Sequence, residues 1–226
     1  MGGFGTYEFW MHMILLAPPL LLSLTVHEYA HARVALAFGD PTAKLMGRVT
    51  LNPLAHLDLI GTICLLFSQV IGWAKPVPVN PANLHPRRLG DIMVSLAGPF
   101  SNLVLAVACG VGLRIWWWRG GFPENVEKDS VSVLLLTATI ANLGLCLFNL
   151  IPLFPLDGHH VVRELLPASR RGDFMSWQVR YGAGMLMALI FVPRILSMAT
   201  GGRINFDPIG RVLSECRDWV LRILLS

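Results

Sequence analysis

The stretch T-V-H-E-Y-A-H at residues 25–31 lies inside a long apolar segment, Phe9–Phe38. Its two histidines are four residues apart, so on a helix they share one face and are separated by one turn. Between residues 9 and 37 the only charged side chains are Glu28 and Arg33. A charged side chain at the centre of a membrane helix costs about 2.5–3.5 kcal/mol on insertion scales, so one that is present there is a candidate for function. We therefore expect one long helix that carries a functional site.

The H-E-x-x-H spacing lets two imidazoles bind a single zinc ion, with the intervening glutamate beside the metal as a general base. The ligands would be His27 and His31, and the base would be Glu28. A simpler interpretation is that these polar side chains only hydrogen-bond neighbouring helices. The two interpretations differ in their requirement for a third ligand, because a catalytic zinc site uses three protein ligands and one open position.

The third ligand must come from a distant part of the chain. Residues 149–160 read N-L-I-P-L-F-P-L-D-G-H-H and offer Asp157, His159 and His160 as candidates. Asp157 is favoured, because it follows a proline-broken helix end and precedes Gly158, which has no side chain to crowd an ion. The alternative is that Asp157 caps a helix over Gly158–Leu166, since aspartate is a preferred N-cap residue.

Composition places the chain in a membrane. Of its 226 residues, 54% are hydrophobic and 14% are charged, whereas soluble domains carry about 25% charged residues. We expect an integral membrane protein with a single membrane-embedded domain over residues 1–226, surrounded by the lipid bilayer. The net charge of +4 is small and scattered, so we expect no nucleic-acid partner. The sequence carries no signal for an oligomeric state.

The hydrophobic pattern predicts an all-α polytopic fold with about four transmembrane helices. A further apolar run of about 13 residues is too short to span a bilayer, so it is expected to be a re-entrant or buried helix. Two short segments are predicted to be membrane-associated β segments, and the tail is predicted to be an amphipathic helix at the interface. The four spans are Phe9–Phe38, Ile92–Leu113, Val131 to about Leu153 and Tyr181–Met198; the apolar run is Ile60–Gly72, the β segments are Gly47–Asn52 and Ala74–Asn80, and the tail begins at Asp207.

Positive charges give the orientation. Lysines and arginines concentrate in cytoplasmic loops of membrane proteins. Basic residues lie near the end of the first predicted span and just after it, and others follow the third span. The first group is Arg33, Lys44 and Arg48, and the second is Arg163, Arg170, Arg171 and Arg180. Both halves of the candidate site are therefore expected on the cytoplasmic side.

Three motifs together resemble the site-2 protease family of intramembrane zinc metalloproteases. They are H-E-Y-A-H at residues 27–31 in an apolar segment, A-G-P-F-S-N at 97–102, and N-x-x-P-x-x-P-L-D-G at 149–158. The resemblance covers most of residues 17–160, and the intervening segments look like the small prokaryotic branch of the family, without a PDZ insertion. The sequence departs from the pattern at His159, where the family often has a second glycine.

The resemblance implies one zinc ion per chain on His27, His31 and Asp157, with Glu28 as the base. It also implies that Asn102 and Asn149 line the site, where an amide could hold the substrate backbone or the oxyanion. Helix–helix hydrogen bonding is the alternative role for both asparagines.

The implied activity is hydrolysis of a peptide bond in or near a transmembrane segment. The implied substrates are single-span membrane proteins or remnant signal peptides in a prokaryotic cell (inner) membrane, with a role in regulated intramembrane proteolysis. The substrate helix must unwind first, and we expect the two β segments to pair with the extended peptide. A metal-binding transporter or sensor, or a catalytically silent scaffold that binds membrane helices, are the competing hypotheses.

Overall fold

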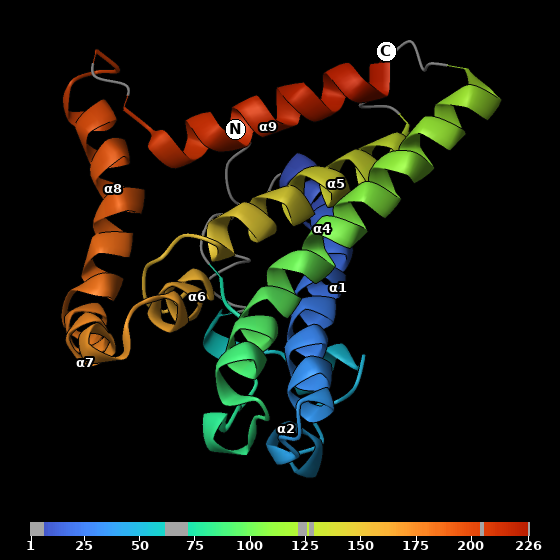
Figure 1. Cartoon of the computed structure of the whole chain (residues 1–226). Helices are drawn as coiled ribbons and strands as arrows, with labels where there is room; N and C mark the ends of the chain where they lie inside the picture. The colour runs from blue at the N-terminus through green and yellow to red at the C-terminus, as the bar shows by residue number, and fades with distance from the viewer. Residues whose placement is uncertain (1–6, 62–71, 122–125, 127–128, 204–205, 226) are drawn as a thin grey trace.

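The computed structural model describes residues 7–61, 72–121, 126, 129–203 and 206–225. Within these ranges the chain is helical with irregular connections (Figure 1). The helices are α1 (Tyr7–Ala37), α2 (Thr42–Leu45), η1 (Pro53–Ala55), η2 (Pro81–Asn83), α4 (Arg87–Gly120), α5 (Ser130–Asn149), α6 (Gly158–Leu165), α7 (Ala168–Trp177), the π-helical η4 (Gln178–Gly182), α8 (Ala183–Ala199) and α9 (Pro208–Leu225).

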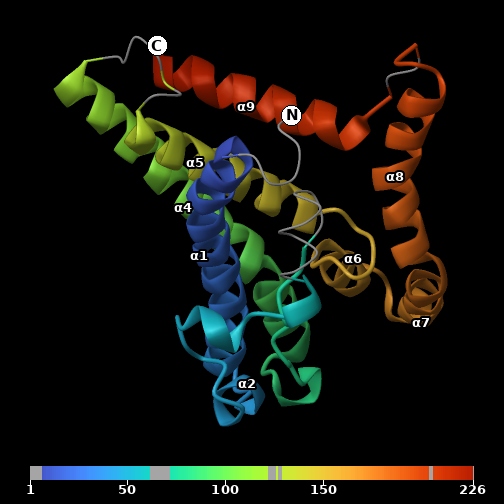
Figure 2. The same ribbon diagram turned by 180° about the vertical axis from the view of Figure 1, so that it is seen from behind.

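Three long helices form the centre of the molecule. Helices α1, α4 and α5 pack against one another, and the views from front and back both show α1 lying along α4 (Figures 1 and 2). Buried residues of α4 recur every three or four positions, and several of them are small: Gly90, Gly98, Ala106 and Gly110. Small side chains on one face let helix backbones approach closely in a membrane, so this stripe brings α4 close to its neighbours.

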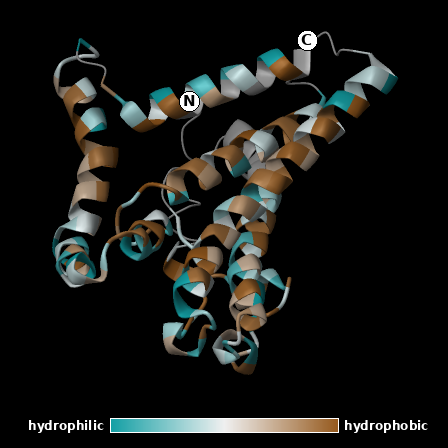
Figure 3. Cartoon of the chain, viewed as in Figure 1, coloured by the Kyte–Doolittle hydropathy of each residue, from teal (hydrophilic) through white to brown (hydrophobic). Residues whose placement is uncertain are grey.

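Three helical segments are long and apolar enough to cross a membrane, among the residues that the structure describes. They are Arg87–Gly120, Ser130–Asn149 and Ala168–Ala199, the last of which runs through α7, η4 and α8. Apolar side chains remain exposed along these segments, for example Val104, Val107 and Val111, each more than half exposed. Apolar residues predominate along the middle of α4, α5 and α8 (Figure 3). Such exposed apolar surface fits contact with lipid.

These three segments cover the second, third and fourth spans predicted from the sequence. The first predicted span forms the 31-residue helix α1, with Pro18 and Pro19 inside it, but α1 is not among the three. The count of four spans is therefore not confirmed.

The predicted β segments are not confirmed either. Residues 47–52 and 74–80 run as irregular chain, and the only pairing there, among described residues, is an isolated antiparallel bridge between Leu57 and Ala74. Proline at positions 76 and 78 removes backbone donors that a strand ladder would need. The predicted re-entrant helix, Ile60–Gly72, lies mostly outside the described residues.

The buried carboxylate of Asp40 holds the irregular chain that follows α1 in place. Gly39 turns the chain with a φ of +100°, a backbone conformation that favours glycine. The fully buried Asp40 then accepts hydrogen bonds from the Asn80 backbone N–H (2.7 Å), the Asn83 side-chain amide (2.9 Å) and the Thr42 hydroxyl (2.5 Å). This carboxylate joins the end of α1 to residues 80–83.

The C-terminal helices α8 and α9 lie at the periphery of the three central helices. Helix α8 stands apart from α1 and α4, and its packing partners are η4 and α9 (Figures 1 and 2). Helix α9 contacts α4 and α5. Its polar residues recur about every three or four positions among apolar ones, which agrees with the amphipathic helix predicted for the tail (Figure 3).

Candidate metal centre

Helix α1 places His27 and His31 one turn apart, and both imidazoles are buried, at 6% and 8% exposure. Each ring is oriented through its Nδ1 atom. His27 Nδ1 donates to the Asn102 side-chain oxygen (2.6 Å), and His31 Nδ1 donates to the Val94 carbonyl (2.7 Å). A histidine that donates from Nδ1 presents its Nε2 lone pair to a ligand. Both Nε2 atoms therefore face the same space.

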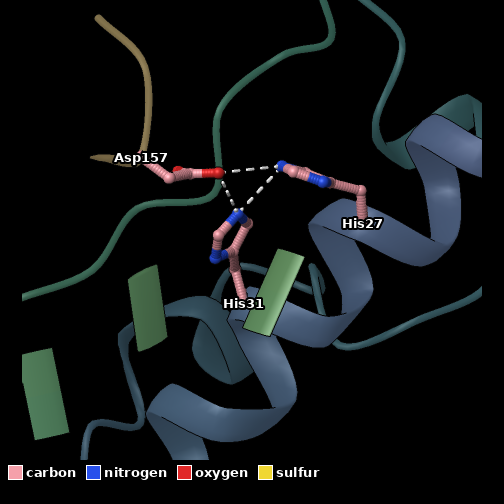
Figure 4. Close-up of side chains that lie close together, drawn as sticks. All are labelled: His27, His31 and Asp157. Carbon is pink, nitrogen blue, oxygen red and sulfur yellow. Dashed lines mark hydrogen bonds and ion pairs between the residues drawn. The ribbon is translucent and has the colours of Figure 1, made fainter. Parts of the chain in front are cut away.

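Asp157 reaches this space from the loop between α5 and α6. Its Oδ2 lies 3.2 Å from His27 Nε2 and 3.4 Å from His31 Nε2, and the two Nε2 atoms are 3.0 Å apart (Figure 4). Asp157 occupies the N-cap position of α6, yet its side chain makes no capping hydrogen bond. The Asp157 side chain therefore faces the histidines and does not cap α6.

The three converging atoms fit a metal ion better than they fit one another. With both Nδ1 atoms protonated, each Nε2 is an acceptor, and a carboxylate oxygen is also an acceptor. Asp157 Oδ2 is buried without a hydrogen-bond partner. A cation between the three would satisfy all of them. Ligand atoms about 2.0–2.1 Å from a tetrahedral zinc ion lie about 3.3–3.4 Å from one another, close to the distances observed here.

Gly98 of α4 leaves room at this point. A methyl group built at Gly98 would overlap His31 Nε2 and His27 Nε2. The glycine lies one turn before Asn102 and one turn after Val94, the two residues that orient the histidines. One face of α4 therefore supplies both hydrogen-bond acceptors and the space between them.

The loop that carries Asp157 is fixed by contacts from both sides. A side chain at Gly158 would collide with the backbone carbonyls of Leu150 and Ile151, so glycine is needed for the loop to fold back on itself. The buried Gln178 of η4 accepts a hydrogen bond from the Phe154 N–H (2.9 Å) and donates one to the Pro152 carbonyl (2.7 Å). Gln178 thus ties this irregular loop to the last candidate span.

Helix α6 is also joined to α4. Arg163 forms an ion pair with Asp91, a buried carboxylate of α4. Asp91 lies one turn before Ser95 and close to Val94, whose carbonyl holds His31. The ion pair therefore links the helix that begins after Asp157 to the helix that orients the histidines.

Glu28 follows His27 directly and is partly exposed. Its Oε2 accepts a hydrogen bond from the backbone N–H of Val77 (3.0 Å). Residues 75 and 76 of the same segment are held by the buried Arg48, which donates to the carbonyls of Lys75 (2.5 Å) and Pro76 (3.4 Å). The irregular segment 74–80 therefore lies against the predicted base. The Oε1 atom of Glu28 accepts no hydrogen bond from a described residue.

The two asparagines predicted to line the site differ in their contacts, and only Asn102 touches one of the two histidines among the described residues. Asn102 is fully buried, and while its oxygen accepts from His27, its amide nitrogen donates to the Asn142 side-chain oxygen (2.9 Å). The same nitrogen also donates to the Ser23 carbonyl (3.4 Å), so both N–H donors of Asn102 are used within the protein and its oxygen orients His27. The Asn149 amide donates to the carbonyl of Leu145 in its own helix (3.0 Å).

His159 and His160 lie outside the three-ligand group. His159 is buried, its Nδ1 donates to the Leu156 carbonyl (2.5 Å), and its ring packs edge-on against Phe154. His159 therefore helps to shape the loop that carries Asp157.

Sequence reasoning missed Asn142 and Gln178. Asn142 is a buried polar residue in the middle of a span, and the expense of placing an amide there was the available signal. Gln178 lies at a helix end next to arginines, where a glutamine gives no signal of burial.

The site combines two buried histidines, a carboxylate and a neighbouring glutamate, and it lies among helices of membrane length. This combination is typical of a metallopeptidase embedded in a membrane.

Comparison with known proteins agrees with this class. Residues 115–193 match the model of Peptidase family M50. The chain is 42% identical over 175 residues to YwhC of Bacillus subtilis (strain 168), covering 77% of this chain and 78% of the relative. It is 30% identical over 187 residues to Rip2 of Mycolicibacterium smegmatis, covering 80% and 68% of the two chains.

A more distant relative is MJ0392 of Methanocaldococcus jannaschii, which is 24% identical over 184 residues, 81% of this chain and 42% of that protein. All three relatives bear names that describe zinc metalloproteases. No solved structure matches the chain significantly. The chain belongs to the M50 family, the site-2 proteases. It is a zinc metalloprotease and an integral membrane protein.

Proposed function

We propose that this chain hydrolyses a peptide bond in or near a transmembrane segment of its substrate, with one zinc ion per chain held by His27, His31 and Asp157 and with Glu28 as general base. One observation carries the proposal. Two Nε2 atoms and one carboxylate oxygen converge within 3.0–3.4 Å, beside Glu28 and among helices of membrane length.

Bound zinc would supply Lewis-acid chemistry, activating water and polarising the peptide carbonyl. The protein groups divide the remaining work. Asn102 and the Val94 carbonyl keep the two imidazoles in the tautomer that ligates through Nε2. Asp157, whose Oδ2 atom is buried, would add a negative charge that offsets the charge of the ion.

Glu28 would move the proton. Its Oε1 atom is left for the attacking water, while its Oε2 atom is held by Val77 N–H. The carboxylate would take a proton from the water during attack and deliver it to the leaving nitrogen. The hydrogen bond from Val77 limits the positions that the carboxylate can adopt, which favours the geometry of proton transfer.

The substrate must reach the site as extended chain, because a helical carbonyl is hydrogen-bonded within its own helix. We propose single-span membrane proteins or remnant signal peptides as the substrates, in regulated intramembrane proteolysis. Segment 74–80 lies against Glu28 and remains the candidate docking edge. The carbonyls of residues 75 and 76 already bind Arg48, and the N–H groups of residues 77 and 80 bind Glu28 and Asp40. Pairing with a substrate would therefore use the other backbone groups of this segment.

We place the protein in a prokaryotic cell (inner) membrane with the active site toward the cytoplasm. The positive-inside rule supports this, because Arg163, Arg170 and Arg171 lie on the side from which Asp157 enters the site. A metal transporter or sensor, or a silent scaffold, would bind metal or helices without needing Glu28, so one experiment separates these alternatives from a protease.

The experiment compares wild type with Glu28→Gln and Glu28→Ala in purified protein, measuring zinc content and cleavage of single-span substrates. We expect wild type to cleave, chelation to stop it, and both variants to keep zinc while losing about 10²-fold or more in rate. Loss of zinc from the Glu28 variants would assign this residue to the metal instead. Wild-type turnover retained by Glu28→Gln would rule out its role as the base.

A further inference from the structure

A second polar site lies away from the metal centre, where α4, α6 and α7 meet. A cavity of about 460 Å³ is lined by Arg87 and Arg88 at the start of α4, Arg163 and Glu164 of α6, and Arg171 of α7. The proposed chemistry of the metal centre uses none of these residues.

The guanidinium groups are held in place by internal partners. Arg171 donates to the Glu164 carboxylate (2.7 Å), to the Glu164 carbonyl (3.1 Å) and to the Leu166 carbonyl (3.1 Å). Arg163 pairs with Glu164 (2.9 Å) and with Asp91, and Arg88 donates to the Glu164 carbonyl (2.8 Å). Fixed guanidinium groups lose less conformational entropy when they bind a ligand.

These partners use only part of the donor capacity. Each guanidinium has five N–H donors. Arg171 uses three of them on described acceptors, Arg163 uses two, and Arg88 uses one. Arg87 makes no hydrogen bond or ion pair with another described residue. Among the described residues, the ion pairs of these four arginines involve two carboxylates, those of Asp91 and Glu164, so positive charge is in excess.

The start of α4 adds to this excess. Arg87 and Arg88 occupy the first turn of a 34-residue helix that has no acidic residue in that turn and no side-chain cap. A helix N-terminus carries a partial positive charge, which disfavours cations there and favours anions. An anion in the cavity would relieve the repulsion that the two arginines and the helix end impose on one another.

The candidate spans predict that the cavity lies near the lipid headgroups. Arg87 begins the candidate span Arg87–Gly120, and Arg171 lies in the first turn of the candidate span Ala168–Ala199. Basic pockets between membrane helices at the cytoplasmic surface bind anionic headgroups. We propose that this cavity binds the phosphate group of an anionic lipid. The proposal does not depend on the peptidase mechanism.

The test measures lipid binding by the full-length protein in detergent, using native mass spectrometry. The probes are phosphatidylglycerol, phosphatidylcholine with the same acyl chains, and inorganic phosphate. We expect phosphatidylglycerol to bind wild type more tightly than phosphatidylcholine. Removing Arg87 and Arg88 together (R87Q/R88Q) is expected to weaken that binding by about thirtyfold, at about fivefold for each arginine near the surface.

The matched control removes Arg119 and Arg203, which are exposed and lie outside the cavity, with the same change in net charge. Arg87→Gln alone removes an exposed side chain without a described partner, so it should leave folding intact and weaken binding about fivefold. Equal weakening by the R87Q/R88Q and control variants would overturn the site. A further outcome is that inorganic phosphate displaces the lipid and itself binds more weakly to R87Q/R88Q. This result would show that the cavity binds phosphate and would overturn the assignment to a lipid in favour of a soluble phosphate.

Discussion

Gly98 sets how closely α4 can approach the two histidines of α1. Any side chain at this position would occupy space between or beside the Nε2 atoms. The neighbouring contacts of α4 at Val94 and Asn102 require that close approach, because they hold the imidazoles at 2.6–2.7 Å. The requirement at position 98 is therefore steric.

Gly98→Ala is expected to lower zinc affinity by about tenfold or more while the helices still form. The added methyl group would push the imidazoles away from the positions in which they converge with Asp157. Zinc content after equilibration with a competing chelator measures the effect. Gly112→Ala is the control in the same helix, because a methyl group there meets Leu135 at an ordinary 3.8 Å. Equal zinc content in the two variants would contradict the steric argument.

At the scale of residues, the sequence indicated side chains that the structure brings together, His27, His31 and Asp157, while their role as metal ligands stays a prediction. His27, Glu28, His31 and Asp157 could be named because helical spacing and a proline-broken helix end are local signals. The role of Asn102 could not be predicted, because it depends on the packing of α4 against α1 and on Asn142 of α5. The pattern of residues in one segment gives no information on how far that segment lies from another in the folded protein.

At the scale of elements, Gln178 connects the loop before α6 to the π-helix η4. Its two hydrogen bonds bind both the N–H of Phe154 and the carbonyl of Pro152. Gly182, one turn later, gives Phe154 room to pack there, because a side chain at that position would collide with Phe154 and Gln178. The position of Asp157 therefore depends on a helix that contributes no ligand.

Gln178→Leu is expected to weaken zinc binding by about five- to hundredfold. The substitution leaves the Phe154 N–H and the Pro152 carbonyl without their hydrogen-bond partner, Gln178. Each unsatisfied buried group costs about 1–3 kcal/mol. Part of this free energy is expected to appear as disorder of the loop and the rest as weaker zinc binding. Zinc affinity and hydrogen exchange of residues 150–158 are the measurements. Ser176→Ala, two residues earlier and exposed, is the control. Unchanged exchange in the loop of the Gln178 variant would contradict this role.

The Asp40 junction gives a pH dependence outside the membrane-spanning segments. Burial alone would raise the pKa of Asp40, but hydrogen bonds from Thr42, Asn83 and Asn80 outweigh burial and hold this pKa below its ordinary value. A carboxylate with a lowered pKa in the folded state contributes stability above its ordinary pKa and loses it as the pH falls through the folded value.

The midpoint of thermal unfolding is therefore expected to be lower in Asp40→Asn than in wild type at pH 7. The difference should stay constant down to about pH 5 and shrink below about pH 4, as Asp40 of the wild type takes up a proton. A difference that grows with falling pH would show that the carboxylate does not stabilise the junction in its charged form.

Three predicted spans and the tail helix agree with the elements observed, because long apolar runs and helical periodicity are strong local signals. The segments 47–52 and 74–80 were predicted as β from residue preferences. Tertiary contacts hold the second segment in its irregular conformation, because Arg48 and Asp40 bind backbone groups of residues 75, 76 and 80 that a strand ladder would need.

At the scale of the whole molecule, the distribution of charge supports the proposed orientation in the membrane. The basic residues of α6 and α7 lie at the start of one candidate span, and the start of α4 adds two more arginines. The far end of α4 carries three successive tryptophans, residues 116–118, which suit the opposite interface.

Cysteine labelling tests this orientation. In a background without the native cysteines, we expect a membrane-impermeant maleimide to label Arg119→Cys on intact cells and to label Ser169→Cys only after the membrane is opened. The physical reason is the excess of arginine around residue 169. The reverse pattern would place the metal centre on the outer side.

The link between Gln178 and the Asp157 loop also bears on the order in which the protein is made. A chain synthesised from its N-terminus exposes His27 and His31 first, Asp157 later, and Gln178 later still. A growing chain therefore contains every ligand before it contains the side chain that fixes the third one. Gln178 lies within the last candidate span, Ala168–Ala199. An unfinished chain that ends before this residue is therefore expected to contain His27, His31 and Asp157 and yet to bind zinc more weakly than the complete chain does.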